Sequence, residues 1–235
     1  MHLGVIIAAG GVGSRLGMGT SKQLMRLAGQ PVVARSAAIF EAAAVVEEIV
    51  IVIDPVDVER CRSEVVEKFG LRKVRAVVPG GDNRATSVRN GMRELGPATD
   101  TVLVHDGARP LLPPEILASG ILEFDTGDCD GVVFGLPATD TVKEVTAGNR
   151  LVARTPDRSL LWTAQTPQMF RRVVLEKAYQ APPEVLAAST DDSSLVEQAG
   201  GRVKMVLGSA ENIKITTPFD LAVAEEILRR RENLT

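Results

Sequence analysis

Short runs of apolar residues alternate along this chain with segments whose apolar residues have the spacing of a helix. The runs predict strands at residues 3–8, 48–53, 74–78, 101–104, 131–134 and 202–206, and the helical spacing covers residues 31–40, 58–69, 84–95, 114–124, 170–181, 192–198 and 219–230. Apolar runs without polar alternation are typical of strands that are buried on both faces. The order of elements therefore predicts an α/β fold, with a Rossmann-like three-layer α/β/α arrangement around a mostly parallel sheet.

The alternation of runs and helices stops after Leu136. Residues 137–165 alternate apolar and polar side chains instead, and Gly148-Asn149 has the chemistry of a turn. We therefore predict a β-hairpin at residues 137–165 that protrudes from the sheet as an arm. The composition marks no linker and no internal repeat, so we expect one domain over residues 1–235 with the arm inside it.

The composition argues against several classes of function. A net charge of −3 and an aromatic content of 3% disfavour a broad nucleic-acid surface or a stacking platform for single strands. The chain has only two histidines, which rules out a metal site built from several imidazoles. It has no apolar run of about eighteen residues, and its N-terminus lacks the basic region of a signal peptide. We expect no membrane association and a cytoplasmic location, in which Cys61 and Cys129 stay free thiols.

The loops that follow the strands form the expected ligand site, because parallel sheets bind ligands at the carboxyl ends of their strands. Three loops qualify, at residues 9–23, 79–87 and 105–110. Residues 8–23 read AAGGVGSRLGMGTSKQ and carry only two charges, on Arg15 and Lys22. The loop lacks the Gly-Lys-Ser/Thr ending of a P-loop, and its glycine spacing differs from that of dinucleotide-binding loops.

We predict that this glycine-rich loop binds a nucleoside triphosphate through its backbone amides. Arg15 and Lys22 would then supply positive charge at the reacting phosphates. The alternative is a mobile surface loop with two solvated cations.

Five segments together resemble one enzyme family. The opening loop has the pattern A-G-G-x-G-x-R-x-G followed by K-Q, and the other segments are VHDGARP (104–110), TPDRSLLWTAQTPQMF (155–170), TDDSSLVE (190–197) and ENIKITTPFDL (211–221). The loop resembles that of nucleoside-sugar and cytidylyl pyrophosphorylases. The whole set resembles the 2-C-methyl-D-erythritol 4-phosphate cytidylyltransferase family over nearly the whole chain. Two positions depart from the usual family pattern, Leu16 where Met is frequent and Glu211 where many relatives have Asp.

The resemblance implies which residues bind the nucleotide and its metal. By this resemblance, Arg15 and Lys22 are catalytic, and Asp106 binds Mg²⁺ or another divalent cation. The residues that would contact CTP are Ala8, Ala9, Gly10, Gly11, Gly13, Gly81, Asp82 and Ser87. Other interpretations stay open. Asp82 or Asn83 could cap the helix that follows, and Asp106 could be a turn aspartate.

The resemblance also implies the contacts to the acceptor. These are Arg109, Thr141, Arg158, Thr166, Thr190 and Lys214, with Thr141 and Arg158 reaching the site from the arm of a second subunit. Arg109 could equally pair with Asp106, and Arg158 could be a surface arginine paired with Asp157 or with another neighbour. Lys214 could lie at the solvent edge of a strand, and Thr190 could cap a helix.

The implied activity is transfer of the cytidylyl group from CTP to 2-C-methyl-D-erythritol 4-phosphate. The products are pyrophosphate and 4-CDP-2-C-methyl-D-erythritol, in the non-mevalonate route to isoprenoid precursors, and the enzyme would be a homodimer joined through the arm. A phosphate oxyanion is already nucleophilic, so the reaction needs no general base. The alternatives are the same chemistry on ribitol or ribulose 5-phosphate, a nucleotidyltransferase for another base, and a nucleotide-binding regulator without catalytic activity.

Overall fold

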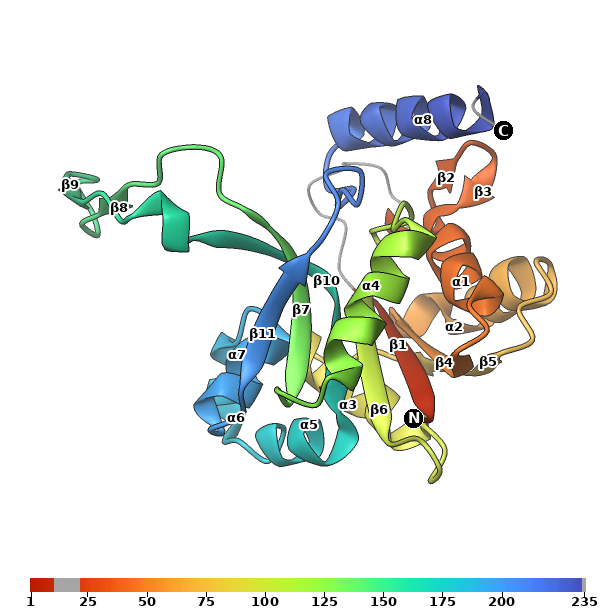
Figure 1. Cartoon of the computed structure of the whole chain (residues 1–235). Helices are drawn as coiled ribbons and strands as arrows, with labels where there is room; N and C mark the ends of the chain where they lie inside the picture. Colours follow the sequence, from red (N-terminus) through yellow and green to blue (C-terminus); the bar gives the residue numbers. More distant parts are fainter. Residues whose placement is uncertain (11–21, 234–235) are drawn as a thin grey trace.

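The computed structural model describes residues 1–10 and 22–233, except for the side chain of Lys22. Its centre is a seven-stranded sheet in the order β11-β7-β10-β6-β1-β4-β5 (Figure 1). The strands are β1 (Leu3–Ala9), β4 (Val46–Ile53), β5 (Val74–Pro79), β6 (Thr101–Asp106), β7 (Gly131–Pro137), β10 (Trp162–Arg171) and β11 (Val203–Leu207). Only β10 runs antiparallel to its neighbours, β6 and β7. The predicted α/β class with a mostly parallel sheet is confirmed, and each predicted apolar run is a strand of this sheet.

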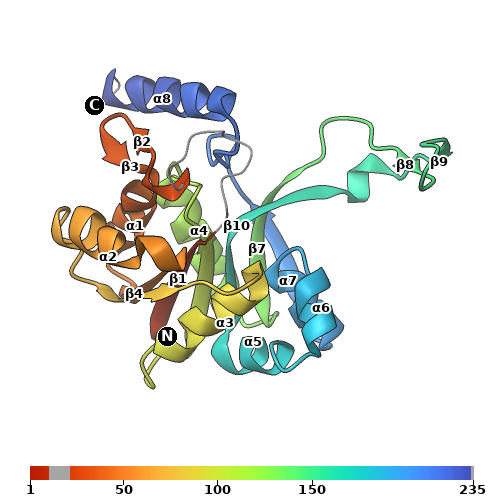
Figure 2. The same ribbon diagram turned by 180° about the vertical axis from the view of Figure 1, so that it is seen from behind.

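Helices cover both faces of the sheet, as Figures 1 and 2 show from opposite sides. The described helices are α1 (Val32–Ala42), α2 (Val58–Cys61) with its π-helical continuation η3 (Arg62–Glu67), α3 (Arg84–Glu94), α4 (Pro114–Asp125), α5 (Arg172–Ala178), α6 (Pro183–Ala188), α7 (Asp192–Gln198) and α8 (Pro218–Asn233). Successive side chains of a strand point to opposite faces. In β1, Val5 and Ile7 therefore belong to the core under α1, α2 and α4, whereas Ile6 belongs to the core under α3, α5 and α7. The three predicted layers are present.

The prediction was wrong where β10 lies. Residues 137–165 were predicted as the arm and residues 170–181 as a helix, but β10 spans Trp162–Arg171 and α5 begins only at Arg172. Proline is rare in central strands because it donates no ladder hydrogen bond. The pairing of β10 with β7 is irregular between Ala164 and Gln168, and Pro167 lies within this irregularity. The break in the ladder is what allows proline inside a buried strand. The short helix α6 was also missed.

Residues 138–161 extend away from the body of the molecule (Figures 1 and 2). They contain the strands β8 (Glu144–Val145) and β9 (Val152–Arg154), which pair antiparallel, and the 3-10 turn η4 (Arg158–Leu160). Gly148 lies between the two strands with a φ of +89°, a conformation that favours glycine. Large apolar side chains on and beside this segment are exposed: Val142, Val145, Leu151, Val152, Leu160 and Trp162. The role of this arm in dimerisation stays a prediction.

The C-terminal helix α8 packs over the segment that precedes it. Its residue Ala224 belongs to a small apolar cluster with Leu27, Leu111 and Ile215. Arg231, near the end of α8, pairs with Glu211 at 2.6 Å and donates a hydrogen bond to the carbonyl of Leu111. These contacts hold residues 211–216 against the carboxyl edge of the sheet. In the part of the chain that the structure describes, no helix is long and apolar enough to cross a membrane.

Candidate active site

The described parts of the three predicted loops meet at the carboxyl edge of the sheet. The amide of Gly107, just after β6, donates to the carbonyl of Ala8 in β1 at 2.9 Å, and the amide of Gly80, just after β5, donates to the carbonyl of Ile53 in β4 at 2.7 Å. A Cβ atom on Gly10 would lie 3.9 Å from the Cα atom of Gly80. The segments after β1, β5 and β6 are therefore neighbours, as the parallel topology predicts.

Much of the glycine-rich loop lies outside the described residues. This applies to Gly11, Gly13 and Arg15, three of the predicted phosphate contacts, and to the side chain of Lys22. The backbone of Lys22 begins the short 3-10 helix η1 (Lys22–Leu24). Ala8 and Ala9 end β1, and Gly10 follows them directly.

Residues 79–87 form a tightly fixed turn before α3. The side chain of Asn83 accepts a hydrogen bond from the Thr86 amide at 2.8 Å, so the N-cap of α3 is Asn83, and Asp82 is exposed. The Ser87 hydroxyl accepts from the amide of Gly81 at 3.0 Å and donates to the carbonyl of Asn83 at 2.9 Å. A Cβ atom on Gly81 would lie 2.2 Å from Cγ2 of Thr86, so only glycine fits there. The helix cap leaves the Asp82 carboxylate available to a ligand.

Asp106, the last residue of β6, faces three cations. Its Oδ2 atom lies 2.7 Å from Nζ of Lys214 and 3.6 Å from Nε of Arg109, and its Oδ1 atom lies 3.7 Å from Nε of Arg84. Burial works against the charged carboxylate, yet Arg84 and Lys214 hold the pKa of Asp106 well below its ordinary value. Asp106 therefore stays ionised, and together the four side chains carry a positive charge suited to a phosphate group.

The structure bears on several of the alternatives left open by the sequence. Arg109 faces Asp106 and donates to the carbonyl of Asn212 at 2.8 Å. Lys214 lies in an irregular segment, not in an edge strand, and pairs with Asp106. The N-cap of α7 is Asp191, whose side chain accepts from the Ser194 amide, and Thr190 beside it is exposed.

The predicted acceptor contact Thr166 lies in β10 and is buried behind Asp106. Its hydroxyl accepts from the amide of Asp106 at 3.0 Å, and it lies 3.2 Å from Nδ1 of His105. The other ring nitrogen of His105, Nε2, lies 2.9 Å from the carbonyl of Arg109. Burial lowers the pKa of His105 to about 4, so the ring is neutral. Since a carbonyl can only accept, Nε2 carries the proton, and the Thr166 hydroxyl donates to Nδ1.

The two predicted contacts in the arm are exposed. Arg158 donates to the carbonyl of Thr139 at 2.7 Å, whereas the Asp157 carboxylate accepts from the amide and hydroxyl of Ser159. In the described arm Arg158 therefore bonds with a neighbour, Thr139, and not with Asp157. Thr141 lies before β8 and is exposed. Both residues belong to the segment that extends away from the body, so within one chain they do not join the cluster around Asp106.

Sequence reasoning missed Arg84 and its ion pair with Asp192. Arg84 begins α3, and its Nη2 atom lies 2.8 Å from Oδ2 of the buried Asp192. The Tyr179 hydroxyl donates to the other carboxylate oxygen of Asp192 at 2.5 Å. The motif TDDSSLVE marked this aspartate, but nothing in the motif indicates that an arginine about a hundred residues earlier completes the pair.

The chemistry of Asp106 fits a metal that enters with phosphates. Among the residues that the structure describes, no group of three or more His, Cys, Asp or Glu side chains could hold an ion. Magnesium, however, is often bound by one or two carboxylates together with substrate phosphates and water. Asp106 can be that carboxylate, because its Oδ1 atom is 3.7 Å from the nearest cation recorded in the described residues. Glu211, which stands where many relatives have Asp, is paired with Arg231.

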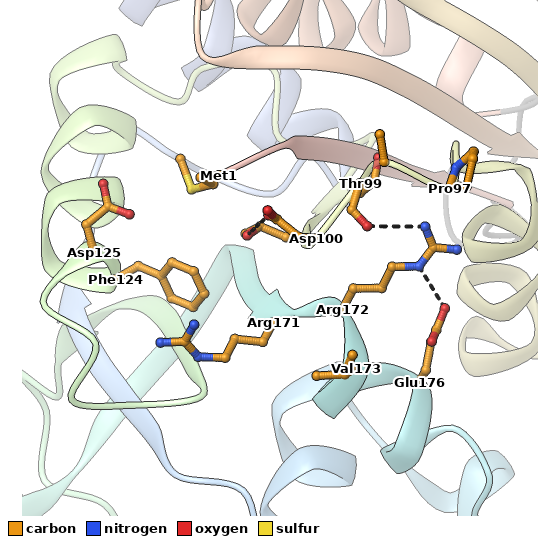
Figure 3. A pocket seen from close by; sticks show the side chains of 12 residues that line it. Met1, Pro97, Thr99, Asp100, Phe124, Asp125, Arg171, Arg172, Val173 and Glu176 are labelled. Carbon is orange, nitrogen blue, oxygen red and sulfur yellow. Dashed lines mark hydrogen bonds and ion pairs between the residues drawn. The ribbon is translucent and has the colours of Figure 1, made fainter.

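A cavity of about 810 Å³ lies at the opposite edge of the sheet (Figure 3). Arg172 projects across it between Thr99 and Glu176, and the guanidinium of Arg171 lies 5.5 Å from the centre of the Phe124 ring. Arg172 donates to two backbone carbonyls and pairs with Glu176, so its charge is already used within the protein. The cavity is remote from Asp106 and is no candidate for the active site.

Comparisons with known proteins agree on one family. The family model described as "IspD: 2-C-methyl-D-erythritol 4-phosphate cytidylyltransferase" matches residues 3–230. Proteins of that name from Alkaliphilus metalliredigens and Pelotomaculum thermopropionicum are 41% and 44% identical to the chain, and each alignment covers 97% of this chain and 94% of the relative. The crystal structure of 4-diphosphocytidyl-2C-methyl-D-erythritol synthase from Anaerococcus prevotii superposes with a TM-score of 0.81 at 29% identity, covering 97% of this chain and 96% of that one.

Proposed function

The chain belongs to the 2-C-methyl-D-erythritol 4-phosphate cytidylyltransferase family, and from this premise we propose that it transfers the cytidylyl group of CTP to 2-C-methyl-D-erythritol 4-phosphate. The products are pyrophosphate and 4-CDP-2-C-methyl-D-erythritol, an intermediate of isoprenoid biosynthesis. The observation that carries the proposal is the match to this family over 97% of the chain. The cluster of Lys214, Arg109 and Arg84 around Asp106 supports it, since both substrates are phosphates.

In the proposed reaction, a phosphate oxygen of the acceptor attacks the α-phosphorus of CTP, and pyrophosphate leaves from the opposite side. The oxyanion is nucleophilic without loss of a proton. The imidazole next to the site, on His105, is neutral and hydrogen-bonded at both nitrogens, so its role is structural. Arg15 and Lys22 stabilise the charge that grows on the α-phosphate and the leaving group.

The nucleotide is assigned to the segments after β1 and β5. Ala8, Ala9 and the glycines that follow receive the phosphates through their amides, and Gly81, Asp82 and Ser87 receive the base and ribose. The support is geometric, since Ser87 fixes this turn and the Asp82 carboxylate is exposed. A backbone held in this way needs no reorganisation when the nucleotide binds.

The acceptor is assigned to Lys214, Arg109, Thr166 and Thr190, with Thr141 and Arg158 from a second subunit. Lys214 is the residue best placed to bind the acceptor phosphate, because it pairs with Asp106 while almost half of its side chain stays exposed. Thr166 contributes by holding the backbone of Asp106.

A divalent cation such as Mg²⁺ belongs to the proposal as a partner of the CTP phosphates. Asp106 would hold it, and the cation would neutralise phosphate charge during the transfer. Because a lone carboxylate beside three cations is a poor resident metal site, we expect the metal to bind with CTP and only weakly before it.

We also propose a homodimer joined through the arm, in the cytoplasm. The exposed apolar side chains of the arm, such as Leu151 and Leu160, support an interface with a second copy of the chain. The two cysteines are free and buried, which is usual in a reducing compartment.

Pyrophosphate release tests the function. CTP, UTP, ATP and GTP are each combined with 2-C-methyl-D-erythritol 4-phosphate, ribitol 5-phosphate and ribulose 5-phosphate, with Mg²⁺ present. We expect rapid release only with CTP and the methylerythritol phosphate. Turnover of ribitol 5-phosphate instead would refute the acceptor while leaving the chemistry intact, and turnover with GTP alone would refute the nucleotide.

A further inference from the structure

Arg84 occupies a position that the stability of its own helix does not explain. It is the first residue of α3, and a cation in the first helical turn is disfavoured by the positive end of the helix dipole. Burial also opposes its charge, yet Asp192 and Asp106 raise the pKa of Arg84 above its ordinary value. The two carboxylates, and not the helix, therefore account for an arginine at this position.

The partner of Arg84 is rigidly fixed. Asp192 is fully buried, its Oδ1 atom accepts from the Tyr179 hydroxyl at 2.5 Å, and its Oδ2 atom lies 2.8 Å from Nη2 of Arg84. Its amide and the amide of Ser193 both donate to the side-chain oxygen of Gln168, at 3.1 and 3.0 Å. The hydrogen bonds with Tyr179 and Gln168 fix Asp192, and in the described residues its Oδ2 atom has an ion pair with Arg84 but no hydrogen bond.

The other end of the guanidinium faces the active site. Nε of Arg84 lies 3.7 Å from Oδ1 of Asp106, on the side opposite Lys214 and Arg109, which both face Oδ2. Arg84 thus belongs to the nucleotide segment at residues 79–87, faces the strand end at Asp106, and pairs with Asp192 in the acceptor segment that contains Thr190. A planar guanidinium presents its donors in a fixed fork, so it can face two carboxylates at once.

We propose that Arg84 is a positioning residue for the cytidylyl transfer. Its ion pair with Asp192 lets Arg84 hold the Asp106 carboxylate in place and fixes the nucleotide segment relative to the acceptor segment. This inference rests on the proposed function. Without the fork of Arg84, the Oδ1 atom of Asp106 loses the cation that the described residues place beside it, and the carboxylate turns toward Lys214 and Arg109. The reacting groups would still bind but would be misaligned.

The competing explanation is that Arg84 only neutralises a buried aspartate. Removing one partner of a buried ion pair is strongly destabilising, whereas replacing both partners together is tolerated. The double variant R84Q/D192N therefore separates the two explanations. Neither substituted side chain is charged, so no unpaired charge is buried, and the amide oxygen introduced at position 192 can still accept a hydrogen bond from Tyr179. R84K keeps the charge beside Asp192, but its single nitrogen cannot face both carboxylates.

The experiment measures kcat, both KM values and Tm for R84Q, R84K, R84Q/D192N and the control R93Q. Arg93 is exposed in the last turn of the same helix, so R93Q should match the wild type. We expect R84Q to have a lower Tm and a lower kcat than the wild type. In R84Q/D192N the Tm should return to the wild-type value, while kcat at saturating CTP should stay about tenfold to a hundredfold below wild type, the effect of a misplaced reacting group. R84K should keep Tm and recover kcat only in part, with KM for CTP nearly unchanged in all variants.

Recovery of both Tm and kcat in R84Q/D192N would overturn the proposal and leave Arg84 a structural residue. A wild-type kcat in R84K would also overturn it, since charge without the fork would then suffice. All variants are assayed with the acceptor that the wild type uses best. A wild type that rejects the methylerythritol phosphate therefore refutes only the proposed acceptor, and the comparison among variants still decides the role of Arg84.

Discussion

At the scale of single residues, the site depends on one carboxylate surrounded by cations. Asp106 is paired with Lys214 and faces Arg109 and Arg84, and its amide is held by Thr166. Such a cluster is stable without substrate because the carboxylate offsets part of the repulsion among the cations. It can also accept a phosphate, because the cations exceed the carboxylate in charge. We therefore expect this one carboxylate to serve both folding and substrate binding.

Replacing this carboxylate tests its role directly. We expect Asp106→Asn to lower kcat by about a hundredfold or more, since it removes the carboxylate proposed to hold the divalent cation at the reacting phosphates. Steady-state pyrophosphate release at saturating CTP measures this, and Asp130→Asn, a substitution outside the site, is the control. A kcat near that of the wild type would show that Asp106 has no part in the reaction.

The neutral histidine behind Asp106 predicts a pH dependence of stability. His105 has a pKa of about 4 in the folded protein against an ordinary value of 6.5, so between these values the unfolded chain binds a proton that the native protein does not. Stability is therefore full above pH 6.5 and falls as the pH drops toward 4, by about 3 kcal/mol from this group. Urea unfolding of the wild type and of His105→Gln at pH 7, 5.5 and 4.5 measures the difference. The decline in unfolding free energy should be smaller in His105→Gln than in the wild type. His2→Gln, which alters the exposed histidine, should show the same decline as the wild type. Equal declines in all three proteins would contradict this prediction.

At the scale of elements, the sequence predicted the sheet well because buried parallel strands are continuous apolar runs. The prediction failed at β10, because Pro167 and polar residues are not typical of a central strand. The irregular pairing of β10 with β7 accommodates them. At the site, the loops and Asp106 followed from topology, since strand ends meet at one edge. Of the partners of Asp106, only the nearby Arg109 was considered from the sequence; Arg84 and Lys214 were not, because they reach Asp106 from segments separated in sequence. Periodicity reports which residues are buried along an element and carries no information about which distant charges meet.

The junction between β10 and α5 gives a prediction about stability without activity. Arg172, the first residue of α5, donates to the carbonyl of Thr99 and pairs with Glu176 (Figure 3), and it also donates to the carbonyl of Gly96. Arg172→Met should lower the unfolding free energy by about 1–3 kcal/mol, because these carbonyls lose their donor. The same substitution should leave kcat unchanged. The neighbouring Arg171→Met, which removes a contact with the Phe124 ring, should have less than about 1 kcal/mol of effect. Equal losses in chemical denaturation of the two variants would contradict the role given to Arg172.

At the scale of the whole molecule, the body and the arm differ in the burial of their apolar side chains. The body has cores on both faces of its sheet, whereas the arm exposes apolar side chains such as Leu151, Val152 and Leu160. Two residues assigned to the acceptor, Thr141 and Arg158, belong to the arm and are separated from the cluster at Asp106 within one chain. With these assignments, a single chain has an incomplete site and a second copy completes it.

Mixing two inactive variants tests this sharing of sites. In Arg158→Ala the arm is defective and the body intact, and in Asp106→Asn the reverse holds. When equal amounts exchange subunits at random, half of the dimers are mixed, and each mixed dimer has one site with an intact body and an intact partner arm. We therefore expect the mixture to regain about a quarter of the wild-type activity, although each variant alone is nearly inactive. Sedimentation before and after mixing establishes that dimers form and exchange. If the exchanged dimers are no more active than the separate variants, Arg158 acts within its own chain or not at all, because only a residue contributed by the partner can restore a site in this way.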